Sequence, residues 1–169
     1  KTKAIMPVQL NGRTCDMDAI KEIADQNGLL IIEDSAQGLG SLYKDRMAGT
    51  FGIAGTYSFY PAKVLGCFGD GGAMMTNDDE LSEKLRMIAN HGQSKRYFHD
   101  IVGCNSRLDN IQAAVLRIKL KELDQYILNR QKAADYYNQK LKDLDQITLP
   151  SRNLDSNHVF HQYTLKLHD

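Results

Sequence analysis

The chain has 169 residues, 42% of them apolar, which is enough for one domain of ordinary size with a hydrophobic core. Its 21 Lys and Arg residues are balanced by 21 Asp and Glu residues, so no broad positive field is available to hold nucleic acid or anionic lipid. Its three cysteines are far apart and form no C-x-x-C pair, which argues against a disulfide framework and a zinc site, and no apolar run approaches the ~20 residues that span a bilayer. We therefore expect a cytoplasmic globular protein without a metal, with no nucleic-acid or membrane partner.

The beginning of the chain predicts a strand, a helix and a second strand. Residues 4–10 form a short apolar run typical of a buried strand. Asp16 is placed to cap a helix over residues 17–27, and Gly28 suits a left-handed cap at its end. Residues 29–32 form a continuous apolar run, as in strands that are covered on both faces. This order predicts a crossover connection and an α/β layer.

The middle of the chain predicts two more strands and a helix. Residues 50–59 and 73–77 are short strand candidates. Asn77, followed three residues later by a glutamate, predicts a capping box for a helix over residues 78–90. Residues 91–107 have no sustained period and predict a functional loop or a crossing connection.

The last part predicts a long helical region and then a strand. From residue 108 to about residue 144 apolar side chains recur at helical spacing, which predicts one long helix or a broken pair. Pro150 and polar residues end this pattern, and residues 158–169 predict a strand. The first residue is Lys1 and not Met, the first run, KTKAIMPVQL, resembles an element already under way, and the chain stops at a strand-like run, HQYTLKLHD, so we expect a piece of a longer protein.

One acidic and one amide side chain follow the second predicted strand. The carboxylate of Asp34 should emerge at the carboxyl end of that strand, where open α/β sheets bind their ligands. The alternative, that Asp34 only caps the following turn, is equally consistent with the spacing. Gln37 stands three residues further on and by itself indicates little.

Lys63 lies between an aromatic run and a glycine-rich segment in SFYPAKVLGCFGDGG. A solvated surface lysine is the commonest state of this residue type. Here apolar and backbone groups would surround the amine, an environment in which a lysine can act as a nucleophile. The glycines that follow match neither the triphosphate-binding nor the dinucleotide-binding pattern, so they predict a tight turn.

The histidines predict no metal site. His158 and His161 stand three residues apart in a predicted strand, so they would point to opposite faces. His99 shares an unpatterned loop with Arg96 and Tyr97, and these three side chains are candidates for contact with a charged substrate.

Four separated motifs carry a family resemblance. EDSAQGLG, SFYPAKVLGCFGDGGAMMTND, HGQSKRY and GCNSRLDNIQAA, with the long helical region after them, resemble the DegT/DnrJ/EryC1/StrS family of pyridoxal-phosphate-dependent nucleotide-sugar aminotransferases. The motifs occur in the family's order and cover nearly the whole chain. The resemblance implies an α/β fold: a partial aspartate-aminotransferase-like (fold type I) large domain with the start of a small C-terminal domain. Residues 1–107 would belong to the large domain, 108–145 to a connecting helix or helix pair, and 146–169 to the small domain.

The resemblance also implies roles for individual residues. Lys63 would be the Schiff-base lysine for pyridoxal 5'-phosphate and the general base, and Asp34 would pair with the pyridine nitrogen. Gln37 would contact the side of the ring that carries the hydroxyl, and Ser58 would bind the phosphate. The implied reaction is a ping-pong transfer of an amino group, from an amino acid such as glutamate to a keto nucleotide-sugar, in polysaccharide or amino-sugar biosynthesis.

The implied site is shared between two subunits. Asn105 matches a family position that reaches the phosphate of the neighbouring subunit's cofactor, and Arg107 lies close by, so a homodimer is expected. Arg107 joins Arg96, Tyr97 and His99 as a candidate for substrate binding.

Three alternatives stay open at this point. An enzyme of the same family could act on a cyclitol ketone, or it could act as a dehydratase, although relatives that dehydrate replace the lysine by histidine. The chain could also be a non-catalytic truncated module. Family members continue before and after this segment, and the preceding part helps to hold the phosphate, so we expect the isolated chain to be inactive.

Overall fold

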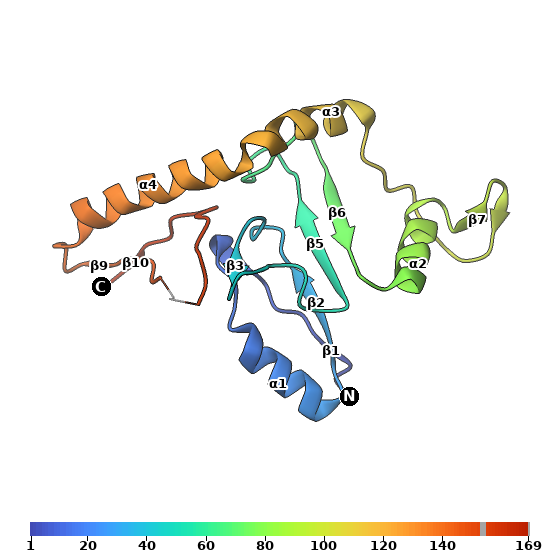
Figure 1. The fold of residues 1–169 in the computed structure, drawn as a ribbon, viewed down its shortest axis with the longest axis horizontal. Coiled ribbons are helices and arrows are strands. Elements are labelled where there is room, and N and C mark those ends of the chain that lie inside the picture. Colours follow the sequence, from blue (N-terminus) through green and yellow to red (C-terminus); the bar gives the residue numbers. More distant parts are fainter. Residues whose placement is uncertain (153–154, 169) are drawn as a thin grey trace.

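The computed structural model describes residues 1–152 and 155–168. Its centre is a four-stranded sheet in the order β1-β2-β5-β6 (Figure 1). Three of these strands are parallel and the edge strand β6 runs antiparallel to β5. The four strands are β1 (Ala4–Ile5), β2 (Leu30–Asp34), β5 (Ala54–Ser58) and β6 (Gly72–Met75).

Helix α1 (Met17–Asn27) makes the crossover between β1 and β2, as predicted. Both predicted caps are confirmed: Asp16 Oδ1 accepts a hydrogen bond from the Ala19 N–H at 3.1 Å, and Gly28 has a φ of 60°. The buried face of α1 packs on the sheet and forms the first core cluster. Its buried members are Met17, Ala24, Ile31 and Tyr43.

Helix α2 (Asp79–Ala89) is confirmed, but its predicted cap is wrong by one residue. Asp78, and not Asn77, caps the helix, because the Asp78 carboxylate accepts a hydrogen bond from the Leu81 N–H at 3.0 Å. A carboxylate is a cap as good as an amide, and its charge is also stabilised by the helix dipole.

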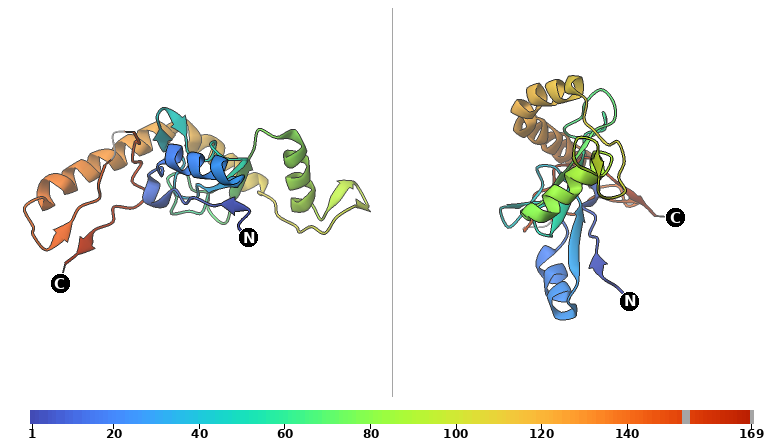
Figure 2. Two further views of the ribbon diagram at one scale, coloured as in Figure 1. Left: turned by 90° about the horizontal axis from the view of Figure 1, so that it is seen from below. Right: turned by 90° about the vertical axis from the view of Figure 1, so that its right-hand side faces the viewer.

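Two hairpins were not predicted. The first joins β3 (Leu42–Tyr43) to β4 (Arg46–Met47), and the second joins β7 (Gln93–Lys95) to β8 (Phe98–His99). Their strands have only two or three residues, which is too short for an alternating pattern to be recognised in the sequence. The β7–β8 hairpin projects with α2 from one end of the elongated molecule (Figures 1 and 2).

The long helical region is a broken pair, one of the two predicted forms. Helix α3 (Asn110–Lys119) continues through the short helix η2 (Leu120–Glu122) into α4 (Leu123–Leu141). After α4 the chain turns and runs back alongside that helix (Figures 1 and 2). Across the described residues, no helix combines the length and apolarity needed to cross a membrane.

The strand predicted over residues 158–169 is wrong for most of its length. Only β10 (Lys166–Leu167) forms, paired antiparallel with β9 (Ile147–Thr148). Phe160 has a φ of 48°, a left-handed conformation that interrupts any strand. Residues 153, 154 and 169 of the predicted final segment, 146–169, lie outside the described residues. The predicted division at residues 107 and 145 stays a prediction.

Candidate active site

The carboxyl ends of β2 and β5 bring Asp34 and Ser58 to the same edge of the sheet. Asp34 pairs in register with Thr56 of β5, and Ser58 follows two residues later at the end of that strand. Since the two strands are parallel, both side chains stand at the edge where α/β sheets bind ligands. The fold therefore groups two of the predicted site residues.

Asp34 is held firmly at this edge. Its backbone N–H donates to Pro7 O at 3.0 Å, and its carbonyl accepts from the Gln9 N–H at 2.9 Å. The Oδ1 atom accepts from the Ala36 N–H at 3.1 Å, so Asp34 caps the following turn, and whether it does only that stays open. No hydrogen bond from residues 1–152 or 155–168 reaches Oδ2, and this oxygen can still accept one.

Gln37 is fixed by a loop that is distant in sequence. Its Oε1 atom accepts a hydrogen bond from the Asn11 N–H at 2.6 Å. The amide oxygen is therefore occupied, which leaves the NH₂ group of Gln37 to donate to a ligand. Asn11 adopts a φ of 59°, so the loop itself is tightly turned.

Lys63 lies on residues 59–71, which we call the lysine loop. The loop follows Ser58, the last residue of β5, whose hydroxyl oxygen accepts from the Tyr60 N–H at 3.3 Å. The Lys63 N–H donates to Tyr60 O at 2.9 Å, which closes a turn, and the Cys67 N–H donates to Phe59 O at 2.8 Å. The backbone of Lys63 is therefore set by bonds within its own loop.

Helix α3 holds the lysine loop from one side. Leu116 packs with two buried residues of the loop, one of them Leu65, in a second core cluster. Gln112 Oε1 accepts from the Phe68 N–H at 2.8 Å, and the Lys119 ammonium donates to Gly66 O. The three residues of α3 share one face of the helix, since they are spaced by four and three positions.

The end of the chain holds the loop from the other side. Val64, Ile127 of α4 and Val159 form a third buried cluster. Residues from three distant parts of the sequence therefore meet beside Lys63. The Lys63 side chain is half-buried and, within the part of the chain that the structure describes, its amine has no hydrogen-bond or ion-pair partner.

Glu33 supports the site and was missed in the sequence. It is fully buried, with an exposure of 0%, and its carboxylate accepts from the N–H groups of Gly49, Phe51 and Gly52 at 2.7, 2.5 and 3.0 Å. These bonds tie a glycine-containing loop to β2 directly beside Asp34. In the sequence, the only indication of this supporting role is that Glu33 is a charged residue within an otherwise apolar strand.

Asn105 and Arg107 lie on the linker between β8 and α3. The Arg107 Nε–H donates to Asn105 Oδ1 at 2.9 Å, and Asn105 also pairs with Asn90 in an isolated bridge. Both side chains are exposed. Among the described residues, neither bonds to Asp34 or Lys63.

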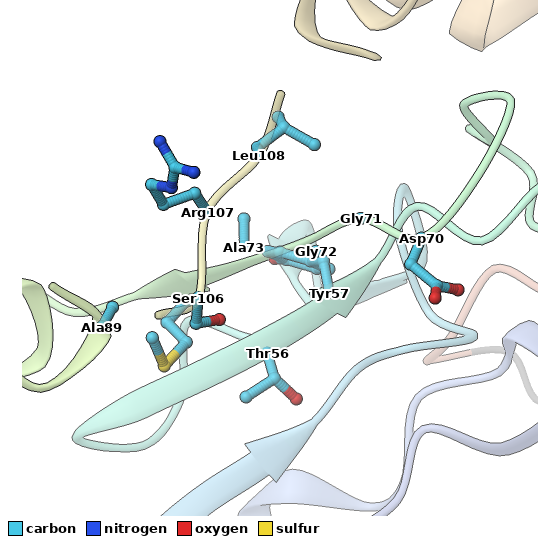
Figure 3. Close-up of a pocket in the computed structure, with 11 residues that line it drawn as sticks. Thr56, Tyr57, Asp70, Gly71, Gly72, Ala73, Ala89, Ser106, Arg107 and Leu108 are labelled. Atoms are coloured by element: carbon cyan, nitrogen blue, oxygen red, sulfur yellow. The ribbon is translucent and has the colours of Figure 1, made fainter. Parts of the chain in front are cut away.

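Arg107 lines a hollow of about 490 Å³ over the face of β5 and β6 (Figure 3). Thr56 and Tyr57 form its floor, Ser106 and Arg107 pass over it, and the guanidinium of Arg107 points away from the sheet. Asp34 is not among the residues that line the hollow. Asp70 and Gly71, at the end of the lysine loop, also line the hollow, whereas Ser58 and Lys63 do not.

Arg96, Tyr97 and His99 lie on the β7–β8 hairpin. The Arg96 guanidinium stacks over the Tyr97 ring at 4.9 Å, and a nitrogen of the His99 ring bonds to His91 O at 2.9 Å. The hairpin projects at the end of the molecule opposite to α4, so one chain does not bring these side chains to Lys63 (Figures 1 and 2).

The fold and the site together define a class of protein. A carboxylate at the carboxyl end of one parallel strand, with a lysine on the loop that follows the neighbouring strand, is typical of the edge at which α/β enzymes bind their ligands. The chain belongs to the DegT/DnrJ/EryC1/StrS aminotransferase family, which it matches over residues 1–169.

Named relatives agree with this family. The chain is 48% identical over 168 residues to a "Pleiotropic regulatory protein" of Geobacillus stearothermophilus, covering 98% of this chain and 45% of the relative. It is 47% identical over 166 residues to dTDP-3-amino-3,4,6-trideoxy-alpha-D-glucose transaminase of Streptomyces venezuelae, covering 98% of this chain and 44% of the relative.

A solved structure confirms the predicted fold. The S. venezuelae protein DesV, crystallised with a ketimine intermediate, superposes with a TM-score of 0.94 at 47% identity, over 98% of this chain and 45% of DesV. This chain therefore has part of the α/β fold of DesV. The chain spans about half the length of the curated relatives it matches.

Proposed function

We propose that the protein to which this chain belongs is a pyridoxal 5'-phosphate-dependent aminotransferase, with Lys63 as the residue that forms the Schiff base. The observation that carries this proposal is the position of the Lys63 amine. It is half-buried and unpaired within the described part of the chain, on a loop packed from two sides, at the sheet edge that carries Asp34.

The residues at this edge fit the cofactor. The free Oδ2 of Asp34 suits a protonated pyridine nitrogen, because an opposite charge close by favours the charged form of the ring. The Ser58 hydroxyl can donate to a phosphate while its oxygen accepts from the Tyr60 N–H. The NH₂ group of Gln37 can donate to the ring hydroxyl. When bound, pyridoxal 5'-phosphate supplies an electron sink for the charge left on the amino carbon.

Lys63 has two tasks in this proposal. Its Nζ atom first makes the covalent link that anchors the cofactor. When free, the same Nζ would take a proton from the amino carbon of the substrate and return it to the cofactor carbon bonded to the same nitrogen, so one side chain would be both anchor and general base. The packing of the lysine loop by α3 and by Val159 would restrict the positions open to this amine.

The proposed substrates are an amino acid, glutamate, and a keto nucleotide-sugar, which react in turn by a ping-pong mechanism. The name of the S. venezuelae relative, a transaminase that makes a 3-amino sugar, supports a nucleotide-sugar and a ketone at carbon 3. We further propose that the enzyme is a cytoplasmic homodimer with shared sites, to which Asn105 and Arg107 contribute.

The test is reductive trapping. Pyridoxal 5'-phosphate is added to the whole protein, borohydride follows, and the labelled peptides are identified by mass. We expect one predominant label, on Lys63, and its loss in Lys63→Ala. Lys132→Ala, which alters an exposed lysine of α4, should leave the label in place. If Lys63 carries no label in a folded protein, the chain is a non-catalytic module and the proposal fails.

A second measurement separates the enzyme alternatives. Supplying glutamate and a panel of ketones, with 2-oxoglutarate as the readout, should give product with keto nucleotide-sugars. Product with cyclitol ketones alone would assign the enzyme to the cyclitol alternative instead.

A further inference from the structure

Two polar groups, a ring nitrogen of His161 and the amine of Lys63, have no hydrogen-bond partner within the described residues. One can accept a hydrogen bond and the other can donate one. The Nδ1 atom of His161 is buried and has no hydrogen bond within the described part of the chain. The Lys63 amine, which has only donors, is also unpaired there. A buried ring nitrogen without a partner is costly, so it normally marks a group that is still to be bound.

The chain places His161 next to the site through several distant contacts. The Val159 N–H donates to Gly12 O at 2.8 Å, and the Gln162 N–H donates to Asn11 O at 3.3 Å. These bonds seat residues 159–162 on the loop whose Asn11 N–H holds Gln37. The fit is tight, because a Cβ at Gly12 would lie 2.8 Å from the His161 backbone nitrogen.

Two further contacts fix this segment against the lysine loop and α4. Val159 packs with Val64, the residue after Lys63, and with Ile127. The Arg130 Nη1–H donates to the carbonyl oxygens of Phe160 and His161 at 3.1 and 3.3 Å. The segment that carries His161 is therefore packed against the lysine loop at Val64 and hydrogen-bonded to the loop at Asn11 that holds Gln37.

Burial and the charges around His161 both favour the neutral form of its imidazole. Burial lowers the pKa of His161 below its ordinary value, and the positive charges of Lys63 and Arg130 lower this pKa further. A neutral imidazole has one ring nitrogen that donates and one that accepts. With the proton on Nε2, Nδ1 is an acceptor beside a cation.

His158, three residues earlier, differs in this respect. Its Nδ1 atom accepts from the Phe160 N–H at 3.0 Å, and its ring stacks on the Phe160 ring with centroids 3.8 Å apart. His158 is therefore a satisfied core residue, whereas His161 retains an unused acceptor.

We propose that His161 is a positioning residue for Lys63. The two groups are not bonded in this structure, and a rotation of the Lys63 side chain would let its amine donate a hydrogen bond to His161 Nδ1, which would hold the amine at the sheet edge. The pairing itself requires no cofactor, while its importance for the reaction rests on the proposed function. No atom of His161 takes part in bond making, and its role is to restrict the directions in which Nζ points.

The pairing is tested by nuclear magnetic resonance, following the ring signals of His161 through a pH titration. We expect Lys63→Met to raise the pKa of His161, because a nearby positive charge is removed, and Lys63→Arg to keep it low. Lys21→Met, which removes an exposed charge on α1, should change nothing. If the pKa of His161 is the same in Lys63→Met and in the unchanged protein, the two groups are not neighbours and the inference is wrong.

The role in the reaction is tested by the trapping experiment on His161 variants. The rate at which pyridoxal 5'-phosphate and borohydride label Lys63 should fall about tenfold in His161→Leu, the value of one hydrogen bond to a charged group. His161→Gln, which restores an acceptor, should recover most of this rate.

The two proposals fail in different ways. Unchanged labelling in His161→Leu overturns the positioning role and leaves the proposed function intact. Absence of labelling in the unchanged protein overturns the proposed function, and the titration of His161 in Lys63→Met still decides whether the two side chains are paired.

Discussion

The two carboxylate oxygens of Asp34 differ: one is hydrogen-bonded to the backbone, and the other is available to a ligand. Oδ1 accepts from the Ala36 N–H and ends the strand, while Oδ2 meets no donor among the described residues. The neighbouring Glu33 is the opposite case, since three backbone N–H groups and the Gln9 amide occupy its carboxylate. One acid therefore stabilises the loop behind the site, and the next is available to a ligand.

The charge of Asp34 should matter more for turnover than for cofactor binding. Asp34→Asn keeps an oxygen for the Ala36 N–H but removes the charge that stabilises a protonated ring nitrogen. We expect turnover in the whole protein to fall by about 10- to 1000-fold, which corresponds to ~1–3 pKa units at that nitrogen. Steady-state rates and the bound cofactor, read from its absorbance, measure the two effects separately.

The control for this substitution is Asp25→Asn, on the exposed face of α1, which should leave both quantities unchanged. Should Asp34→Asn retain full turnover with cofactor bound, Asp34 would be a turn cap and nothing more.

His158 should make the chain sensitive to acid. Burial lowers the pKa of His158 to about 4, and the charge of Arg13 adds to this effect. Below pH 6.5 the His158 ring binds a proton in the unfolded chain, whereas in the folded chain it stays neutral down to about pH 4. The contribution of His158 to stability is therefore fully present above pH 6.5. It falls as the pH drops from about 6.5 to about 4, by up to about 3 kcal/mol, and this contribution is constant below.

Urea unfolding at a series of pH values measures this loss. His158→Gln should flatten the free energy of unfolding over that pH interval, whereas His168→Gln, at an exposed position, should not. A profile that keeps its slope in His158→Gln would assign the acid sensitivity to other groups.

Helix α3 acts at the scale of elements as a clamp on the lysine loop. One helical face supplies an apolar contact through Leu116 and two polar contacts through Gln112 and Lys119. Within the loop, Gly66 packs closely against Pro61, because a Cβ at Gly66 would lie 2.5 Å from Pro61 O. The position of the Lys63 amine thus depends on a helix that begins more than forty residues later.

Leu116→Ala should loosen this clamp. Leu116 is 7% exposed, so we expect a loss of about 2–5 kcal/mol in the free energy of unfolding, the usual cost of a cavity left by leucine. Amide hydrogen exchange in residues 59–71 should become faster as well, because the loop loses its packing.

Ile118→Ala is the matched control on the same helix. Ile118 is 71% exposed and its truncation should change stability by less than about 0.5 kcal/mol. If the two variants unfold alike, α3 does not support the loop.

At the scale of the whole molecule, the predicted site residues fall into three groups, one of which, Arg96, Tyr97 and His99, lies on the projecting β7–β8 hairpin. Asp34, Gln37, Ser58 and Lys63 lie on the sheet edge or directly after it, whereas Asn105 and Arg107 lie on a linker and bond to each other. In the homodimer proposed above, a second copy of the chain would bring its Asn105 and Arg107 to the sheet edge that carries Asp34.

Mixing two inactive variants tests this arrangement. Lys63→Ala and Asn105→Ala, each as the whole protein, should be inactive or weak alone. After reversible dissociation of equal amounts, mixed dimers should recover about one quarter of the original activity, since half of the dimers are mixed and each has one intact site. No recovery in dimers shown to be mixed would place both residues in a single chain.

The chain alone should turn over little or nothing. It covers 44% of its S. venezuelae relative, so the remaining part of a complete site has to come from elsewhere. A visible Schiff-base absorbance in the 169-residue chain, abolished by Lys63→Ala, would contradict this expectation.

The amino-acid sequence by itself determined the features that depend on neighbouring residues. Asp16 and Gly28 bound α1, the apolar run before Asp34 forms β2, and the helical period after residue 108 forms α3 and α4, because capping and periodicity act over a few residues. The motifs around Lys63 also sufficed to identify the family.

Only the tertiary structure decided how the two histidines differ. As members of a strand, His158 and His161 would simply have faced opposite ways. Instead, the bonds to the loop at Gly12 and the left-handed turn at Phe160 bury both ring Nδ1 atoms, and within the described residues only that of His158 has a hydrogen-bond partner. Those contacts join residues separated by about a hundred positions or more, and their geometry comes from packing, which no local pattern records.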